Sequence, residues 1–491
     1  MVFNSIHFAI FLPIVFAIYW LLRRNLRLQN LFVVLASYVF YGWWDWHFLI
    51  LIAFTSFCSW GSGLLIGKSL AQPSIKGRSK FWLWLNIAIN LGILVVFKYY
   101  DFFVSSFAGM FGIDASHHLL NVILPVGISF YTFQALSYSI DVYRGRIAPT
   151  KDPIAFFAYV AFFPQLVAGP IERATNLLPQ FEKARTFDYH EAVEGSRRIL
   201  WGLFKKMVVA DNCAIYVDQV WNQMADGANP SGSTLVLAAI LFAFQIYGDF
   251  SGYSDIAIGT AKLFGINLKD NFLTPYFSRS VAEFWKRWHI SLNTWFVDYV
   301  YIPLGGSRPK VDESRESRVE RTIKLITIRN TFVIFLLSGL WHGANWTYVT
   351  WGLYHALLFV PLILMGATKK YRDTATWRQI SQMLLTFGLV VIGWIIFRAP
   401  SIAEACQFMA AICDKSLLSA PWLMNRAFYV PLFIGLMIML VGDWFGREKG
   451  FGLAWISDKP AVVRIAVYYA IVVMIYFWQC QETIQFIYFQ F

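Results

Sequence analysis

Apolar runs long enough to cross a lipid bilayer recur along almost the whole chain. A membrane-spanning helix needs about 20 mostly apolar residues. The runs are continuously apolar and do not alternate with a period of two, which favours helices over a membrane barrel. Charged residues are scarce as well, at 14% of the sequence. The sequence therefore predicts an all-α, polytopic integral membrane protein. The candidate runs lie at 6–22, 31–44, 48–67, 81–104, 119–140, 154–170, 199–217, 234–248, 325–341, 346–366, 381–397, 427–442 and 461–479. We expect about eleven transmembrane helices, with the shorter runs forming re-entrant or interfacial helices.

Basic residues in the short loops predict the orientation of these helices, because cytoplasmic loops are rich in Lys and Arg. No basic residue precedes the first run, whereas three arginines follow it within 23–27. Basic residues also cluster at 68–80, 144–151 and 305–324, while the stretch around Asp114 is uncharged to acidic. These loops agree on one topology, in which the N-terminus lies outside the cytoplasm. The formal net charge of +12 then reflects this bias rather than nucleic-acid binding.

The cysteines and the absence of visible symmetry exclude some classes of protein. The five cysteines are scattered, mostly inside apolar runs, and form no CxxC motif. They predict neither a disulfide framework nor a metal site. No internal repeat is visible, which weighs modestly against a secondary transporter, since many transporters are built from repeats.

Polar and glycine-rich segments interrupt the apolar runs in the middle of the chain. They are QIYGDFSGYSDIAIG (245–259), NFLTPYFSRSVAEFWKRWHISLNTWF (271–296), YIPLGGSR (301–308) and SGLWHGANW (338–346). Polar groups at membrane depth are costly unless they line a protein interior or a wet cavity. We therefore expect the functional site in this region.

The word FWKRWHISLNTW allows two interpretations if it is helical. Four-residue spacing would place Trp285, His289 and Asn293 along one stripe. One interpretation is an amphipathic helix at the membrane interface, with Trp, Lys and Arg at the level of the lipid headgroups. In the other, His289 faces a cavity with support from Asn293, and Lys286 or Arg287 meets a phosphate-bearing ligand at the cytoplasmic surface.

The word SGLWHGANW places an imidazole at the end of an apolar run. On a helix, Ser338 and Asn345 would each share a face with His342, and Gly339 and Gly343 would remove side-chain bulk beside the ring. Small residues also serve helix packing, and a lone buried histidine is often a packing residue. The combination of histidine, glycine and the end of a span favours a functional role.

Three further polar residues allow structural interpretations. Asp249 and Asp255 could form a proton or cation site in a transporter. They could equally hold neighbouring helices together through hydrogen bonds, with Gly248 and Gly252 allowing close approach, and we favour this structural role. His355 lies in the apolar segment WGLYHALLFV, without a cluster of polar residues around it in the sequence, so we expect it to be a packing residue.

Several of these words together resemble the membrane-bound O-acyltransferase family. They are GDFSGYSDIAIG, FWKRWHISL, YIPLGG and LWHGANW, together with ILPVGISFYTFQ (123–134) and FFPQLVAGPIER (162–173). The nearest branch is the one that O-acetylates bacterial exopolysaccharides such as alginate. The resemblance runs from residue 2 to about 360. It implies one membrane-embedded domain over 1–491, with a motif-bearing region at about 120–360 and C-terminal helices at about 380–491 that carry no motif.

The resemblance also implies a site and a reaction. It makes His342 the invariant histidine and His289 the second catalytic position, with Asp249 among the supporting residues. The implied donor is acetyl-CoA, which is cytosolic, so the helices should surround a central tunnel or funnel that leads to the buried histidines. No metal and no permanently bound cofactor are expected. The implied location is the bacterial inner membrane, and the implied partner is a separate periplasmic acetyltransferase, because no predicted loop is long enough to form a polysaccharide groove.

The residues can support this chemistry. Acyl transfer from a thioester requires the attacking hydroxyl to lose its proton, and imidazole is the usual general base because its ordinary pKa is about 6.5. Burial disfavours imidazolium, so His342 should rest in its neutral form. His289 could bind the developing oxyanion, orient the thioester carbonyl or relay the proton, with Asn293 fixing its tautomer. Transfer of D-alanyl or another acyl group to a polymer, lipid or protein, and transport, stay open as alternatives.

Overall fold

The protein is helical throughout the part of the chain that the structure describes. The computed structural model describes residues 1–491 except 168, 307–315, 367–376, 481–483 and 488–491. Eight helical stretches among the described residues are long and apolar enough to cross a membrane by length and composition. An all-α, multi-pass membrane protein is thus confirmed, whereas the expected count of eleven transmembrane helices is not. The eight stretches are α3, α4 with η2 and α5, α12, α15, α16, α17, α19 and α20.

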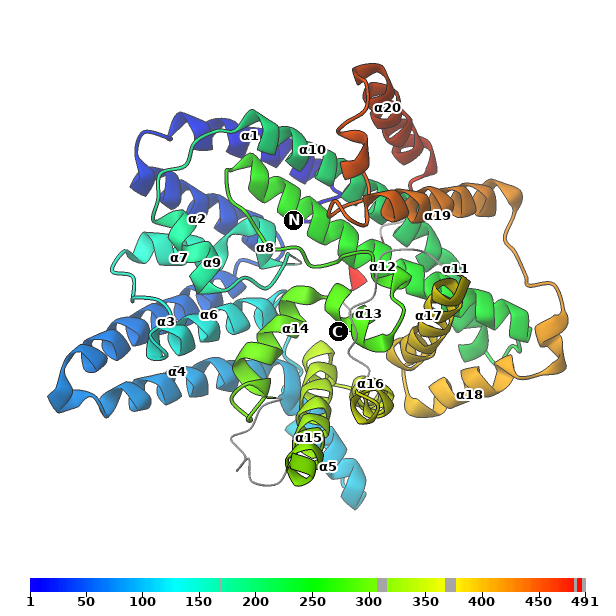
Figure 1. Ribbon diagram of the computed structural model, residues 1–491, viewed down its shortest axis with the longest axis horizontal. Helices are drawn as coiled ribbons and strands as arrows, with labels where there is room; N and C mark the ends of the chain where they lie inside the picture. The colour runs from blue at the N-terminus through cyan, green and yellow to red at the C-terminus, as the bar shows by residue number, and fades with distance from the viewer. Residues whose placement is uncertain (168, 307–315, 367–376, 481–483, 488–491) are drawn as a thin grey trace. The chain divides into compact units, whose positions relative to one another are not determined.

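The described helices fall into two compact units, and the single membrane-embedded domain expected from the sequence stays a prediction. Unit 1 comprises Met1–Ile199 and Tyr253–Lys269, and unit 2 comprises Leu200–Gly252 and Asp270–Phe491. Two helices, α10 (Tyr189–Phe204) and α12 (Gly232–Leu263), have residues in both units. The other helices of unit 1 are α1 (Ile6–Leu21), α2 (Leu26–Gly42), α3 (Phe48–Ala71), α4 (Arg78–Leu94), η2 (Val95–Tyr99), α5 (Tyr100–Phe111), α6 (Ile128–Tyr143), α7 (Pro153–Ala161), α8 (Phe163–Leu166) and α9 (Ala174–Phe181), with the short turns η1 (Pro73–Ile75) and η3 (Ser116–His118) (Figure 1).

Two predicted spans of unit 1 are wrong. The run 119–140 is helical only from Ile128, since the preceding residues form an irregular segment whose amides at Leu120 and Asn121 bond the carboxylate of Asp101. The run 154–170 breaks after Ala161, and a short new helix begins at Phe163. Pro164 in its first turn lacks the amide proton that a continuing helix would need, but it is compatible with a helix start.

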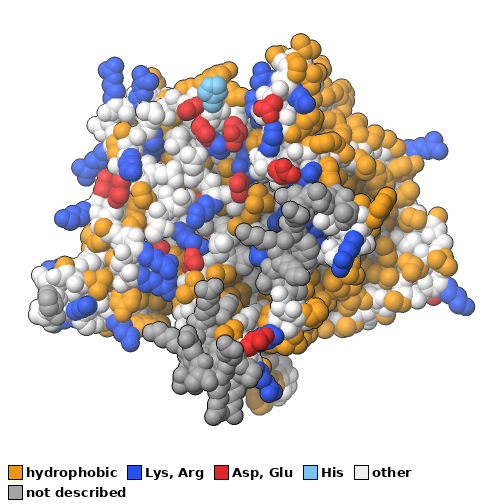
Figure 2. Space-filling view, in the orientation of Figure 1, with side chains coloured by type: hydrophobic (Ala, Val, Ile, Leu, Met, Phe, Trp, Pro, Cys, Tyr) orange, Lys and Arg blue, Asp and Glu red, His pale blue; other side chains and the backbone are white. Residues whose placement is uncertain are grey.

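Unit 2 contains the polar segments 271–296 and 338–346 and the part of 245–259 up to Gly252. Its remaining helices are η4 (Lys205–Ala210), α11 (Asp211–Ala225), η5 (Pro275–Phe277), α13 (Val281–Arg287), α14 (Ile290–Phe296), η6 (Val297–Tyr301), α15 (Glu316–His342), α16 (Trp346–Leu364), α17 (Trp377–Arg398), α18 (Ile402–Ile412), η7 (Lys415–Leu418), α19 (Arg426–Gly446), η8 (Ala454–Ile456) and α20 (Ala461–Trp478). Hydrophobic side chains gather on the surface around α19 and α20 (Figure 2). On α20 they include Val462, Ile465, Tyr469, Val472, Tyr476 and Phe477, which is the kind of surface that a bilayer solvates.

The helices α15 and α16 pack closely side by side, and this pair positions the predicted site (Figure 1). A β-carbon built on Gly339 of α15 would lie 2.2 Å from the backbone oxygen of Tyr348, and one built on Gly352 of α16 would lie 2.2 Å from that of Phe335. Both contacts are far too short for any side chain. Glycine therefore lets the two backbones touch, as small residues do at membrane helix interfaces.

Candidate functional site

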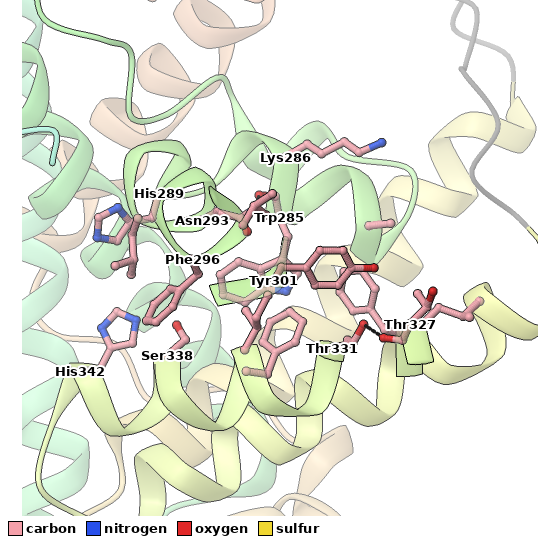
Figure 3. Close-up of a pocket in the computed structure, with 17 residues that line it drawn as sticks. Trp285, Lys286, His289, Asn293, Phe296, Tyr301, Thr327, Thr331, Ser338 and His342 are labelled. Carbon is pink, nitrogen blue, oxygen red and sulfur yellow. Dashed lines mark hydrogen bonds between the residues drawn. The ribbon is translucent and has the colours of Figure 1, made fainter. Parts of the chain in front are cut away.

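A cavity of about 380 Å³ contains both predicted histidines (Figure 3). It is formed by α13, α14, η6, α15 and α16, all within unit 2. His289 and His342 meet at one end of it, with their ring centroids 6.4 Å apart. Most of the remaining lining is apolar. Of the residues singled out from the sequence, Trp285, Lys286, His289, Asn293, Ser338 and His342 line the cavity, together with Ala282, Leu292, Phe296, Val297, Tyr301, Thr327, Thr331, Ile334, Phe335, Phe359 and Ile363.

The chain bends sharply at His289, so the continuous helix assumed for FWKRWHISLNTW does not form. Helix α13 ends at Arg287, and α14 begins at Ile290. Between them His289 adopts a left-handed backbone conformation, with φ 44° and ψ 51°, which is uncommon for a residue other than glycine. Backbone hydrogen bonds to a distant segment replace the helical ones: Leu273 N donates to Arg287 O, and Ile290 N donates to Asn271 O, each at 3.0 Å. These tertiary bonds override the local helical preference.

Asn271, rather than Asn293, hydrogen-bonds the ring of His289. Nδ1 of His289 lies 3.1 Å from Oδ1 of Asn271. The side-chain amide of Asn293 donates instead to the backbone carbonyl of Trp285, so the expected support of His289 by Asn293 is wrong. His289 is almost fully buried, at 1% exposed. This burial lowers the pKa of His289 to about 3, and the ring is neutral at physiological pH.

His342 is the last residue of α15 and is enclosed by aromatic rings. Its ring lies 5.1 Å from that of Trp351 and 5.4 Å from that of Phe397, both edge-on. Ser338, one helical turn earlier, shares the cavity-facing side of α15 as expected. The glycines beside His342 serve packing: a β-carbon on Gly343 would lie 2.1 Å from the ring of Tyr348.

Three predicted supporting residues do not line the cavity. Arg287 pairs with Glu283 at 2.8 Å. Asn345 does not share a helix face with His342, because α15 ends before it. Its side chain instead caps the start of α16 by accepting from Thr347 N at 3.0 Å. Asp249 belongs to a separate buried cluster.

That cluster, which we call the charge cluster, consists of Lys206, Asp211 and Asp249. The Lys206 ammonium lies 2.6 Å from Oδ1 of Asp211 and 2.8 Å from Oδ1 of Asp249, and all three side chains are buried. Asp249 also accepts from the backbone amide of Ile487 at 2.7 Å. Burial raises the pKa of Asp211 to about 7, with Lys206 opposing and Asp249 reinforcing the shift. These contacts favour the interpretation that Asp249 holds helices together.

His355 packs among aromatic side chains, in line with its expected structural role. It is fully buried and accepts a hydrogen bond at Nδ1 from the indole of Trp285 at 3.3 Å. Its ring lies beside those of Trp351 and Phe335. It does not line the cavity.

Reasoning from the sequence missed two groups of residues around the cavity. Asn271 precedes His289 by 18 positions, and no periodicity links the two. Thr327 and Thr331 lie on the same face of α15 as Ser338 and His342. Helical spacing back from His342 would have found them. Within the described part of the chain, no three His, Cys, Asp or Glu residues lie close enough to hold a metal ion.

Comparisons with known proteins agree on a family. The sequence model of the membrane-bound O-acyltransferase family matches residues 146–402, a region that includes both cavity histidines. Among similar proteins, a probable alginate O-acetylase of Pseudomonas aeruginosa is 38% identical over 468 residues, covering 94% of this chain and 84% of the relative. A peptidoglycan O-acetyltransferase of Helicobacter pylori is 34% identical, covering 81% and 77%. A teichoic acid D-alanyltransferase of Bacillus subtilis is 28% identical, covering 56% and 69%.

Proposed function

The chain belongs to the membrane-bound O-acyltransferase family and is an O-acyltransferase, and on this premise we propose that it transfers acetyl groups from acetyl-CoA towards the O-acetylation of an alginate-like exopolysaccharide. The observation that carries the proposal is the pair of buried imidazoles at one end of a mostly apolar cavity. The relatives named as alginate and peptidoglycan O-acetyltransferases support an acetyl donor and a polymeric acceptor.

The chemistry of the cavity fits acyl transfer from a thioester. The acceptor hydroxyl attacks the acyl carbon, the carbon–sulfur bond breaks, and the hydroxyl proton finally leaves with the thiol. His342 is the predicted general base, a role that typically contributes ~10² to 10⁴ in rate. The apolar lining suits an acetyl thioester and its linker, because water is excluded from the reacting carbonyl. Lys286 lines the cavity and is itself exposed, which suits contact with a phosphate of the donor.

The donor can be tested with purified protein in detergent. An acyltransferase will hydrolyse or exchange labelled acetyl-CoA without a sealed membrane, whereas a transporter requires both a membrane and a gradient. We expect slow release of labelled acetate or exchange of label into free CoA. Activity that depends on sealed vesicles and a gradient would instead support transport.

We further propose that the acetyl group passes to a periplasmic acetyltransferase, which then modifies the polymer. The predicted extracytoplasmic loops are short, and a polysaccharide usually requires a sizeable groove. The test is reconstitution. Purified protein with acetyl-CoA and polysaccharide should yield little acetylated polymer, and adding the periplasmic partner should restore the product. Efficient acetylation by the chain alone would refute the relay.

The same proposal places the protein in the inner membrane with a periplasmic N-terminus. In a background without the native thiols, a cysteine introduced at Ser74 should react only after the membrane is permeabilised. A cysteine at Ser116 should react in intact spheroplasts. A third position, Ser314, lies in the basic stretch outside the described residues and should behave like Ser74. Reversed labelling would put acetyl-CoA on the wrong side and overturn the donor assignment.

The similarity to a teichoic acid D-alanyltransferase supports a second candidate, D-alanyl transfer to a cell-envelope polymer. The neighbouring genes would discriminate between them. Polysaccharide biosynthesis genes would support the acetylation proposal, and a teichoic-acid alanylation cluster would support the alternative.

A further inference from the structure

We propose that Asn271 holds His289 as the tautomer protonated at Nδ1, so that Nε2 takes part in acyl transfer as a hydrogen-bond and proton acceptor and not as an oxyanion donor. Asn271 would thus be a positioning residue, acting through His289. This inference rests on the proposed function, because it assigns one of the roles that the cavity leaves open for His289.

The hydrogen bonds made by Ser291 identify the atom of Asn271 that faces His289. The backbone amide of Ser291 lies 3.2 Å from Oδ1 of Asn271, and the Ser291 hydroxyl donates to the same atom at 2.9 Å. A backbone N–H can only donate. The atom that receives it must therefore be the carboxamide oxygen rather than the nitrogen, which fixes the orientation of the amide group.

The oxygen of Asn271 in turn identifies the protonated nitrogen of His289. An amide oxygen only accepts, so the ring nitrogen that lies 3.1 Å away, Nδ1, must carry the hydrogen. A neutral imidazole has one donor and one acceptor nitrogen. Burial keeps the ring neutral, since it lowers the pKa of His289 to about 3. Nε2 therefore carries the lone pair.

Backbone hydrogen bonds hold the segments of Asn271 and His289 together. Asn271 is fully buried, and its backbone carbonyl accepts from Ile290 N, directly after His289. The neighbouring bond from Leu273 N to Arg287 O ties the same two segments together before His289. The backbone segments that carry the two side chains are thus tied together by hydrogen bonds on both sides of His289, which holds Asn271 within reach of the ring.

The described ring contacts of His289 include one with another titratable side chain. The rings of Phe250, Phe272 and Trp341 surround His289, and the only titratable ring among these contacts is that of His342. During transfer the O–H bond of the acceptor breaks as its oxygen bonds the acyl carbon. The proton is held on the imidazole pair and moves to the thiolate when the carbon–sulfur bond breaks. Nε2 of His289 is an acceptor suited to this proton, whereas a neutral ring in this tautomer has no hydrogen at Nε2 to offer an oxyanion.

The tautomer can be measured without any assay of activity. Nitrogen-15 NMR of protein labelled at histidine, compared with the His289→Ala spectrum for assignment, should show a protonated Nδ1 and an unprotonated Nε2 at neutral pH. A hydrogen on Nε2 of His289 in the wild-type protein would overturn the inference. This result stands even if acetyl-CoA proves not to be the donor.

Two substitutions of Asn271 provide the functional test. Asn271→Leu removes the acceptor and should lower kcat by ~10 to 100-fold with little change in KM, as is typical for partners that orient a histidine. Asn271→Asp keeps the acceptor oxygen and adds a negative charge, which raises the pKa of His289. It should retain more activity than Asn271→Leu, and the acidic limb of its pH profile should move to higher pH.

Ser291→Ala is the matched control, because it removes a hydrogen bond to the same oxygen but leaves the bond to His289. We expect its kcat and pH profile to resemble those of the wild type. Equal losses in Asn271→Asp, Asn271→Leu and Ser291→Ala, with unchanged pH profiles, would reduce Asn271 to a packing residue. A wild-type protein that never consumes acetyl-CoA would reject the proposed function instead, and the NMR result would still decide the tautomer.

Discussion

Two of the buried polar regions in the described part of unit 2, the charge cluster and the histidine cavity, differ in how their polar groups are paired. In the charge cluster, Lys206 lies between Asp211 and Asp249, and each charge is met by an opposite one within 2.8 Å. In the cavity, His289 and His342 face an open space lined mainly by apolar side chains. In the cluster the charged groups pair with one another, whereas the cavity leaves room for a ligand.

The pairing of buried charges decides which of the two regions can react. Buried full charges must be paired, because an unpaired one costs several kcal/mol. Such a cluster therefore stabilises a fold but has little capacity to react. Imidazole becomes neutral when buried, so it can remain beside a cavity and still accept a proton. We therefore expect substitutions in the cavity to lower activity and substitutions in the charge cluster to lower stability.

A large loss of activity is expected for His289→Ala. Removal of a group that handles the reacting proton typically lowers the rate by ~10² to 10⁴. Acetyl transfer per folded molecule should fall by that amount, while the yield of folded protein in detergent stays close to that of the wild type. If the substitution changes only the yield, His289 is a packing residue.

The next effect is a loss of stability in Lys206→Met. It leaves two buried carboxylates without their cation, and breaking a buried ion pair on one side costs about 3–5 kcal/mol. The unfolding midpoint in detergent should drop clearly, while the activity of the remaining folded protein is unchanged. A stable Lys206→Met protein without activity would move the cluster into the reaction.

The contributions of the two regions to folding stability should also depend on pH with opposite sign. The folded-state pKa of Asp211, about 7, lies above its unfolded value of 3.8, so its contribution to stability is full below pH 3.8 and is lost as the pH rises towards 7. The folded-state pKa of His289, about 3, lies below its unfolded value of 6.5, so its contribution is lost as the pH falls from 6.5 towards 3. Unfolding midpoints against pH should therefore flatten on the neutral side in Asp211→Asn and on the acidic side in His289→Gln. Superimposable curves for wild type and variants would contradict both assignments.

The smallest effect separates two neighbouring basic residues. Lys286 lines the cavity, whereas Arg287 points to Glu283. Lys286→Ala should raise KM for acetyl-CoA with little change in kcat, because a contact made equally in substrate and transition state affects binding alone. Arg287→Ala should change neither value much, since partly exposed ion pairs contribute only ~0–1 kcal/mol. Equal KM values for both variants would remove Lys286 from the donor site.

The architecture was predictable because hydropathy is a local property of the sequence. The runs at 346–366 and 461–479 became α16 and α20 almost unchanged. The site was only partly predictable. His342 and Ser338 share one helix, so spacing alone places them on one face. The break at His289 and its bond to Asn271 arise from hydrogen bonds between segments that no periodicity connects.

The role of the cavity histidines can be tested by making the same substitution at two buried histidines of unit 2. His342 lines the cavity, whereas His355 is fully buried among aromatic rings outside it. Acetyl transfer from labelled acetyl-CoA would be measured per folded molecule for His342→Gln and His355→Gln. We expect a loss of about 100-fold or more in His342→Gln and near wild-type transfer in folded His355→Gln. Near wild-type transfer by His342→Gln, or equal loss in both variants, would contradict the claim that the cavity histidines carry the reaction.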